Sequence, residues 1–267
     1  MKRLLLIQPS PYDKDKKPIR KSRLYFVGLA LPLLAALTPE DWEVEIILET
    51  IEEIPFETDA DLIGISTMGH GVLRSIDVAR EFRARGKTVV LGGYMASIMP
   101  EEAMKYCDAI VVGDAELVWS EFLEDFTKGE LKSRYEKRHK GPWFSTPAPR
   151  FDLILHKPIG DFLPVQAGRG CPNVCSFCSV ACLYEGSYIR KPIEELDRDL
   201  EQIRKLGFRK VLLLDDNILS DRVYLSQVLK ILKAKDLKWM SQCDIRVGED
   251  EELLESLAES GCTALSF

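Results

Sequence analysis

Three cysteines, Cys171, Cys175 and Cys178, are the residues of this sequence whose type and spacing most clearly indicate chemistry. They follow the pattern C-x₃-C-x₂-C, directly after the apolar run 162–167. Cysteine thiolates hold iron–sulfur clusters, usually four to a cluster. Three thiolates from one tight loop would leave one iron of a 4Fe-4S cluster without a protein ligand. That iron could then bind a substrate or a cofactor directly.

A structural zinc loop, or three unrelated thiols, is the alternative interpretation of this loop. Zinc sites prefer paired C-x₂-C units, with a second pair or histidines roughly 12–20 residues further on. Here one nearby cysteine, Cys182, follows, and no histidine comes after it. Gly168 and Gly170 would let the backbone turn closely around a bulky inorganic group. The pattern therefore favours the iron–sulfur cluster.

Composition and charge narrow the class of protein. The chain has 267 residues, enough for one or two domains with a sizeable core. Its net charge of −7 argues against a general nucleic-acid binder, which is usually basic. Seven cysteines without an export signal favour a reducing compartment, where disulfides are rare. No apolar run approaches the roughly 20 residues of a membrane span. We therefore expect a cytoplasmic protein with no nucleic-acid partner and no membrane span.

The N-terminal part, residues 1–128, alternates apolar strand patterns with helix patterns. Strict alternation predicts an α/β fold with a doubly wound, Rossmann-like parallel sheet. The predicted strands cover residues 4–8, 44–48, 61–66, 88–93 and 108–113, and the predicted helices cover 28–37, 72–85, 100–106 and 114–128. A long basic loop spans residues 9–27. Such a loop could wrap a cofactor, collect phosphate or simply be solvated.

Small residues end two of these strands, at the edge where a doubly wound sheet binds its ligands. Ser66 and Thr67 end one strand, and Gly92 and Gly93 end the next. Their small side chains would let a large flat ligand, or its tail, lie close to the backbone. His70 lies near them, but a surface or loop-capping role suits it better than metal binding. These strand ends form the candidate ligand site of the first half.

The second half, residues 161–267, repeats a strand–helix order typical of a β/α barrel, whose chemistry lies on carboxyl-end loops. Strands are predicted before Gly168 and over 210–214, 237–243 and 263–267, with helices over 194–206, 223–233 and 250–260. Charges and prolines between the halves indicate a linker over residues 129–160. Because the pattern stops at a fourth strand, we expect a fragment, a truncated gene product or half of a split enzyme.

The cysteine motif resembles that of the radical S-adenosylmethionine (SAM) enzymes, in which this spacing follows the first strand of a β/α barrel. Phe177, the aromatic residue just before the third cysteine, fits the same family. The N-terminal half is similar to the cobalamin-binding domain that precedes the barrel in one large branch of this family. The resemblance therefore implies a cobalamin-binding domain followed by part of a radical SAM barrel.

Site residues in the second half follow from this resemblance. Cys171, Cys175 and Cys178 would hold a 4Fe-4S cluster, with Phe177 among the cofactor-binding residues. In this family an acidic motif after the second strand binds the SAM amino group. Asp215 and Asp216 stand there, although the usual Gly-Gly-Glu is absent and a helix-capping role is the alternative. Gln242 and Arg246, after the third strand, could meet the SAM carboxylate or ribose, unless Arg246 is a surface residue.

In the first half, the resemblance implies that Ser66, Thr67, Gly92 and Gly93 line the channel for the nucleotide tail of cobalamin. Many such domains carry Asp-x-His-x-x-Gly after the first strand, and its histidine ligates cobalt. The first loop of this chain contains no histidine. The lower cobalt face should therefore lack a histidine from that loop. The alternative is a doubly wound domain that has lost its ligand.

The activity implied is reductive cleavage of SAM by the cluster, followed by cobalamin-dependent methyl transfer to an unactivated carbon or a related radical rearrangement or cyclisation. It implies a small-molecule substrate and a reductant such as flavodoxin or ferredoxin. The alternative is a non-catalytic corrinoid- or nucleotide-binding module, whose iron–sulfur loop serves folding or electron transfer.

Overall fold

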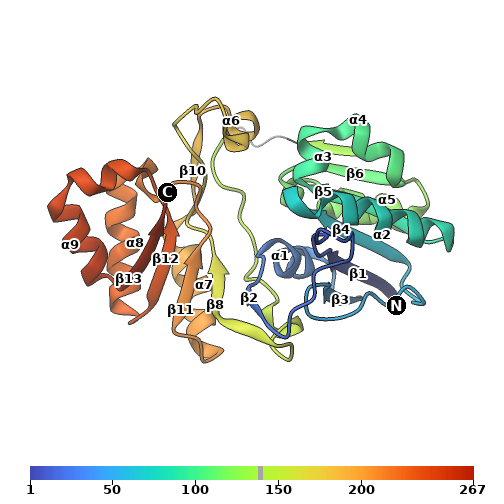
Figure 1. Cartoon of the computed structure of the whole chain (residues 1–267), viewed down its shortest axis with the longest axis horizontal. Helices are drawn as coiled ribbons and strands as arrows, with labels where there is room; N and C mark the ends of the chain where they lie inside the picture. The colour runs from blue at the N-terminus through green and yellow to red at the C-terminus, as the bar shows by residue number, and fades with distance from the viewer. Residues whose placement is uncertain (138–140) are drawn as a thin grey trace. The chain divides into compact units, whose positions relative to one another are not determined.

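The computed structural model describes residues 1–137 and 141–267, which form two compact units (Figure 1). Among these residues, the first unit holds 1–24, 30–137 and 149–158, and the second holds 25–29, 141–148 and 159–267. The stretch 129–160, interpreted as a linker, thus contributes residues to both units. No helix in the described part of the chain is long and apolar enough to cross a membrane.

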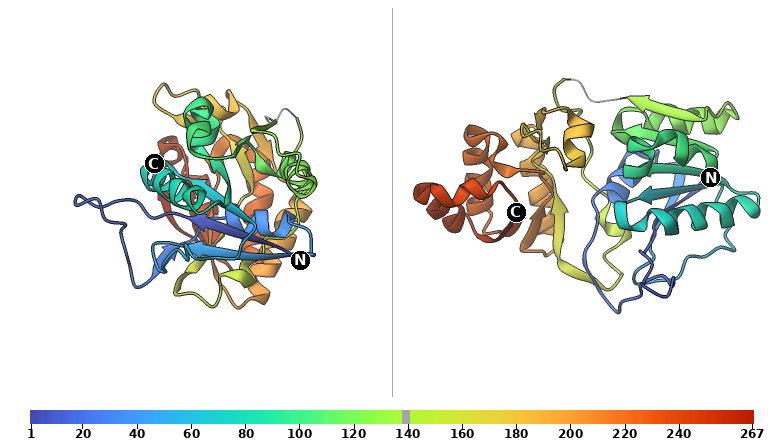
Figure 2. Two further views of the ribbon diagram at one scale, coloured as in Figure 1. Left: turned by 90° about the vertical axis from the view of Figure 1, so that its right-hand side faces the viewer. Right: turned by 45° about the horizontal axis from the view of Figure 1, so that its top comes forward.

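A six-stranded sheet forms the centre of the first unit, in the order β3-β1-β4-β5-β6-β7, and neighbouring strands are parallel. The strands are β1 (Lys2–Gln8), β3 (Trp42–Leu48), β4 (Leu62–Thr67), β5 (Thr88–Gly93), β6 (Ala109–Gly113) and β7 (Arg134–Lys137). Figure 2 shows β1 and β3 side by side in blue. The order of strands reverses at β1 and β4, so their carboxyl ends mark the switch point.

Helices cover both faces of this sheet, which explains why β1 is apolar from Leu4 to Ile7. Leu5 and Ile7 belong to the buried cluster that includes Val78 and Phe82 of α2. On the other side, the indole N–H of Trp119 donates to the hydroxyl of Thr38, just after α1, at 3.0 Å. The helices are α1 (Ala30–Leu37), α2 (Val72–Ala84), α3 (Tyr94–Ile98), α4 (Pro100–Ala103) and α5 (Trp119–Lys128). The predicted doubly wound sheet is confirmed.

The second unit contains a five-stranded sheet in the order β13-β12-β11-β8-β2. The strands are β2 (Leu24–Phe26), β8 (Ile159–Val165), β11 (Lys210–Leu213), β12 (Lys238–Gln242) and β13 (Cys262–Ser266). From β8 to β13 each neighbouring pair is parallel. The longer helices between them are α7 (Ile193–Lys205), α8 (Arg222–Ala234) and α9 (Glu251–Glu259). The strand–helix order predicted for this half is therefore present, and the carboxyl ends of β8, β11 and β12 lie at one edge.

The edge strand β2 lies inside the stretch that the sequence suggests is a loop. Only three residues form it, which is too short for a periodic pattern to separate strand from loop. Its place beside β8 depends on Gly160. A Cβ atom at Gly160 would lie 2.2 Å from the carbonyl oxygen of Tyr25. The close pairing of these two strands is thus decided by a contact distant in sequence.

Replacing Gly160 with alanine should destabilise the second unit by about 1–3 kcal/mol, because the added methyl group would overlap the Tyr25 backbone. Urea denaturation followed by circular dichroism measures this loss. Gly248→Ala is the matched control, since a Cβ atom there would meet nothing within 4 Å. Equal losses in the two variants would show that β2 does not need the close approach.

Candidate metal and cofactor site

The three cysteines lie in a loop between β9 (Gly168–Gly170) and α6 (Ser179–Tyr184), beyond the carboxyl end of β8. Strand β9 pairs antiparallel with β10 (Tyr188–Arg190), which closes the base of the loop. Cys175 is exposed, and Cys171 and Cys178 are half-buried. The backbone N–H of Cys178 donates to the carbonyl oxygen of Cys175 at 3.0 Å. The loop therefore presents three accessible thiols in a turned conformation.

Close contacts with the segment 187–188 explain why glycine stands at positions 168 and 170, a reason that the sequence did not suggest. A Cβ atom at Gly168 would lie 2.3 Å from the hydroxyl oxygen of Tyr188. At Gly170, φ is +79°, and a Cβ atom would lie 2.2 Å from the carbonyl oxygen of Ser187. Both glycines thus allow the segment that returns through β10 to pack against β9. In this structure they make room for protein atoms.

Asp215 and Asp216 follow β11 and hold the cysteine loop through its backbone. Asp215 accepts a hydrogen bond from the N–H of Ala167, and Asp216 accepts one from the N–H of Gly170, each at 2.8 Å. The second oxygen of Asp215 accepts from the hydroxyl of Tyr188 at 3.3 Å. Burial raises the pKa of Asp215 to about 7 and also raises the pKa of Asp216. These contacts give both carboxylates a role in positioning the loop.

Replacing Asp215 with asparagine should flatten the dependence of stability on pH. Because burial raises the pKa of the Asp215 carboxyl from 3.8 to about 7, the folded chain holds this proton more tightly than the unfolded chain. Stability from this group is therefore present at low pH and lost as the pH rises from about 4 to about 7. Asparagine keeps an oxygen for Ala167 and carries no charge.

Urea denaturation of the wild type and of Asp215→Asn at pH 5 and pH 8 tests this expectation. The variant should gain stability relative to the wild type at the higher pH. Asp161→Asn removes one exposed carboxylate of β8, which pairs with Lys210 at the surface, and is the control for the loss of one negative charge. An unaltered slope in Asp215→Asn would contradict the assignment.

Asn217, which the sequence analysis did not single out, connects three strand-end loops. Its amide nitrogen lies 3.7 Å from the sulfur of Cys171. Its amide oxygen accepts from the N–H of Leu219 at 3.1 Å and from the N–H of Asp244 at 3.2 Å. Asn173, within the cysteine loop, donates to the carboxylate of Asp244 at 3.1 Å. The residue that caps the short helix 218–220 is Asn217. Neither of the two aspartates before it has this role.

The other residues predicted to meet SAM are exposed to solvent. Phe177 is 91% exposed, and Gln242 lies exposed at the end of β12. Arg246 is exposed and pairs with Asp244, whose Oδ1 lies 2.9 Å from its Nε. This ion pair and hydrogen bond lower the pKa of the Asp244 carboxyl. Gln242 and Arg246 thus lie at the same edge of the sheet as the cysteine loop, and their predicted roles stay predictions.

In the first unit, the four predicted residues come together at the carboxyl ends of β4 and β5. Ser66 is opposite Gly92, and Thr67 is opposite Gly93. Thr67 is buried, and its hydroxyl donates to the carbonyl oxygen of Gly92 at 2.6 Å. Ser66 and Gly92 are half-buried, and Gly93 is exposed. Three of the four therefore remain accessible to a ligand, while Thr67 ties the two strands together. His70 is exposed.

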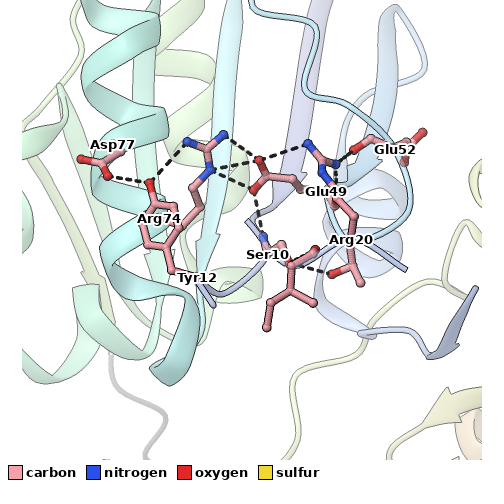
Figure 3. Close-up of polar contacts among 9 residues, drawn as sticks. Ser10, Tyr12, Arg20, Glu49, Glu52, Arg74 and Asp77 are labelled. Atoms are coloured by element: carbon pink, nitrogen blue, oxygen red, sulfur yellow. Dashed lines mark hydrogen bonds and ion pairs between the residues drawn. The ribbon is translucent and has the colours of Figure 1, made fainter. Parts of the chain in front are cut away.

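A buried polar network lies beside this strand edge, at the carboxyl ends of β1 and β3 (Figure 3). Glu49 is fully buried and forms an ion pair with Arg74 of α2 at 2.6 Å. Its other oxygen accepts from the N–H of Ser10 at 2.9 Å. The hydroxyl of Tyr12 donates to Asp77 at 2.6 Å. These contacts attach the loop after β1 to α2, and no local pattern in the sequence reveals them.

The residues of the cysteine loop fit an iron–sulfur cluster in their donor chemistry. They supply three thiols on one accessible loop, and an amide N–H lies beside one of the sulfurs. Among residues 1–137 and 141–267, no three histidine, cysteine, aspartate or glutamate side chains are already gathered as a metal site. The three sulfurs would therefore have to come closer together to hold a cluster.

Comparisons with known proteins agree with both halves of the chain. Residues 19–123 match the family model of the B12 binding domain, and residues 165–267 match that of the radical SAM superfamily. Two curated relatives are from Chlorobaculum tepidum. Bacteriochlorophyllide d C-8(2)-methyltransferase is 30% identical over 94% of this chain and 57% of its own length. Bacteriochlorophyllide d C-12(1)-methyltransferase is 26% identical over 100% of this chain and 60% of its own length.

A solved structure shares the fold across both units. It is the radical S-adenosylmethionine methyltransferase TsrM from Kitasatospora setae, with cobalamin and a [4Fe-4S] cluster bound. The TM-score is 0.72 at 17% identity, and the match covers 99% of this chain and 60% of that chain. The fold and the two matched regions define a radical SAM domain preceded by a B12-binding domain.

The chain belongs to the cobalamin-binding radical SAM family, as its cysteine motif and strand ends predicted. It spans about 60% of the length of the two bacteriochlorophyllide methyltransferases that it matches.

Proposed function

We propose that this chain binds a 4Fe-4S cluster, SAM and cobalamin, and takes part in methyl transfer to a small-molecule acceptor. The observation that carries the proposal is the three-cysteine loop, which Asp215, Asp216 and Asn217 hold at the carboxyl ends of parallel strands. Chemistry in β/α folds lies at that edge. Matches to radical SAM and B12-binding families support the same function.

In this proposal, Cys171, Cys175 and Cys178 hold the cluster and leave one iron open for SAM. When bound, the cluster supplies the electron for reductive cleavage of SAM, and cobalamin supplies the methyl carrier. Gln242 and Arg246 offer polar groups to the SAM carboxylate or ribose. Phe177 and Asp216 complete the cofactor-binding set. Asp215 would position the loop without contacting a cofactor, because its two oxygens accept hydrogen bonds from Ala167 and Tyr188.

In the first unit, Ser66, Gly92 and Gly93 would line the channel for the nucleotide tail of cobalamin. Thr67 would act through its hydrogen bond to the Gly92 carbonyl, which keeps the ends of β4 and β5 together. The loop after β1 offers no histidine to cobalt. We therefore propose that this loop would supply no histidine to bound cobalamin.

We propose that the methyl acceptor is a small molecule. Two relatives are named as methyltransferases of bacteriochlorophyllide d, a small molecule, and this favours methyl transfer to an unactivated carbon over rearrangement or cyclisation. The electron would come from a reductant such as flavodoxin or ferredoxin in the cytoplasm.

Anaerobic reconstitution with iron, sulfide and hydroxocobalamin tests the proposal. We expect 4Fe-4S absorption, an EPR signal of the reduced cluster that changes when SAM is added, and slow reductive cleavage of SAM. A colourless protein with zinc bound between the cysteines would overturn the proposal. A cluster that does not respond to SAM would instead support the non-catalytic binding module.

A further inference from the structure

The sequence contains two asparagines, Asn173 and Asn217, and both lie at the cysteine loop. Asn217 comes from the end of β11, 46 residues after Cys171, and is 5% exposed. Its side chain therefore reaches the base of the cysteine loop from the neighbouring strand. Asparagine offers both a donor and an acceptor in one short, uncharged side chain.

The orientation of the Asn217 amide is determined by its partners. Its oxygen accepts from two backbone N–H groups, those of Leu219 and Asp244, at 3.1 and 3.2 Å. If the amide were flipped, its NH₂ group would face two donors and both hydrogen bonds would be lost. The oxygen is therefore fixed toward the backbone, and the NH₂ group is fixed toward the sulfur of Cys171, 3.7 Å away.

We propose that Asn217 donates a hydrogen bond to the Cys171 thiolate of the bound cluster and thereby raises the reduction potential of that cluster. This inference rests on the proposed function, which places a cluster on Cys171. Asn217 is a positioning residue in this role, because it acts on the cluster through a ligand. It also holds the loops after β8, β11 and β12 at the spacing that the ligand loop requires.

The direction of the effect follows from charge. Reduction adds one electron, whose charge is shared with the cluster sulfurs and the cysteine ligands. A hydrogen-bond donor stabilises the more negative, reduced state more than the oxidised state. Hydrogen bonds to the sulfurs are among the factors that set the potential of iron–sulfur clusters. Removal of the Asn217 donor should therefore make the cluster harder to reduce.

A spectroscopic experiment on the wild-type chain tests the contact itself. The protein is produced with asparagine labelled with ¹⁵N at the side-chain amide only, and its cluster is reconstituted and reduced. Pulsed EPR (HYSCORE) should then detect a ¹⁵N coupling. Since the chain has two asparagines, Asn217→Ser and Asn173→Ser assign the signal. The coupling should vanish in Asn217→Ser and persist in Asn173→Ser.

A redox titration monitored by EPR tests the effect on the potential. Serine at 217 is uncharged and still offers an oxygen that caps the next helix, but it is too short to reach the sulfur. The midpoint potential of Asn217→Ser should shift to more negative values, and that of Asn173→Ser should stay at the wild-type value. Unchanged potentials in both variants, at equal cluster content, would overturn the inference.

The outcomes separate this inference from the proposed function. A wild-type cluster that responds to SAM but shows no ¹⁵N coupling overturns the role of Asn217 and leaves the proposed function intact. A wild-type chain that forms no cluster overturns the proposed function, and the inference with it. The labelled wild-type measurement does not depend on whether a variant folds.

Discussion

Replacement of Cys175 with alanine should reduce the iron and sulfide content of the reconstituted protein to background. Cys175 is the second of the three cysteines in the motif and lies exposed in the loop. With only two thiolates, a second iron of the cluster would have no protein ligand. Reductive cleavage of SAM should disappear with the cluster, and both quantities are measured on one anaerobic preparation.

Cys182→Ala is the matched control for this prediction. Cys182 is also exposed and lies four residues after Cys178, in α6. It is outside the three-cysteine spacing, so iron content and the EPR signal should equal those of the wild type. Loss of the cluster in Cys182→Ala, with retention in Cys175→Ala, would show that the ligand set has been assigned to the wrong thiols.

Replacement of Arg74 with methionine should reduce the free energy of unfolding of the first unit by about 3 kcal/mol. The variant leaves the carboxylate of Glu49, which is 0% exposed, without its closest cation. Breaking a buried ion pair from one side is costly because an uncompensated charge remains in the interior. Ser10 and the more distant Arg20 still contact Glu49, which limits the loss. Urea denaturation measures it.

Arg80→Met, on the same helix, is the control. The Arg80 guanidinium lies 3.6 Å from Asp77 and 4.9 Å from the centre of the Tyr106 ring, and its side chain is 61% exposed. Contacts of this kind are worth about 1 kcal/mol or less. In the variant that carries both Arg74→Met and Glu49→Gln, no buried charge remains, and part of the stability should return. Equal losses in Arg74→Met and Arg80→Met would contradict the role assigned to the network.

The two networks have a common property that explains why sequence reasoning missed them. Glu49 and Arg74 are 25 residues apart, and Asn217 and Cys171 are 46 residues apart. Neither distance corresponds to a turn, a helix or a hairpin. Each pair meets only because parallel strands bring their carboxyl ends to one edge of a sheet. The sequence signal for Asn217 was its place directly after the acidic pair, together with the rarity of asparagine in this chain.

Strands buried on both faces were predictable, because Leu4 to Ile7 form a continuous apolar run that parallel sheets require. Strand β2 was not, because three residues carry no period and their pairing depends on the absence of a side chain at Gly160. Asp215 was predicted at the correct strand end. Its burial and its bond to Ala167 needed the packed structure.

By itself, the sequence determined the class of this protein: alternation of strands and helices specified parallel sheets, and the cysteine spacing predicted a loop that binds an iron–sulfur cluster. These are local properties, written in residue type and period along the chain. The tertiary structure alone decided which side chains surround that loop and how they are oriented. Hydrogen bonds and buried ion pairs form between atoms a few ångströms apart, and only folding brings those atoms together.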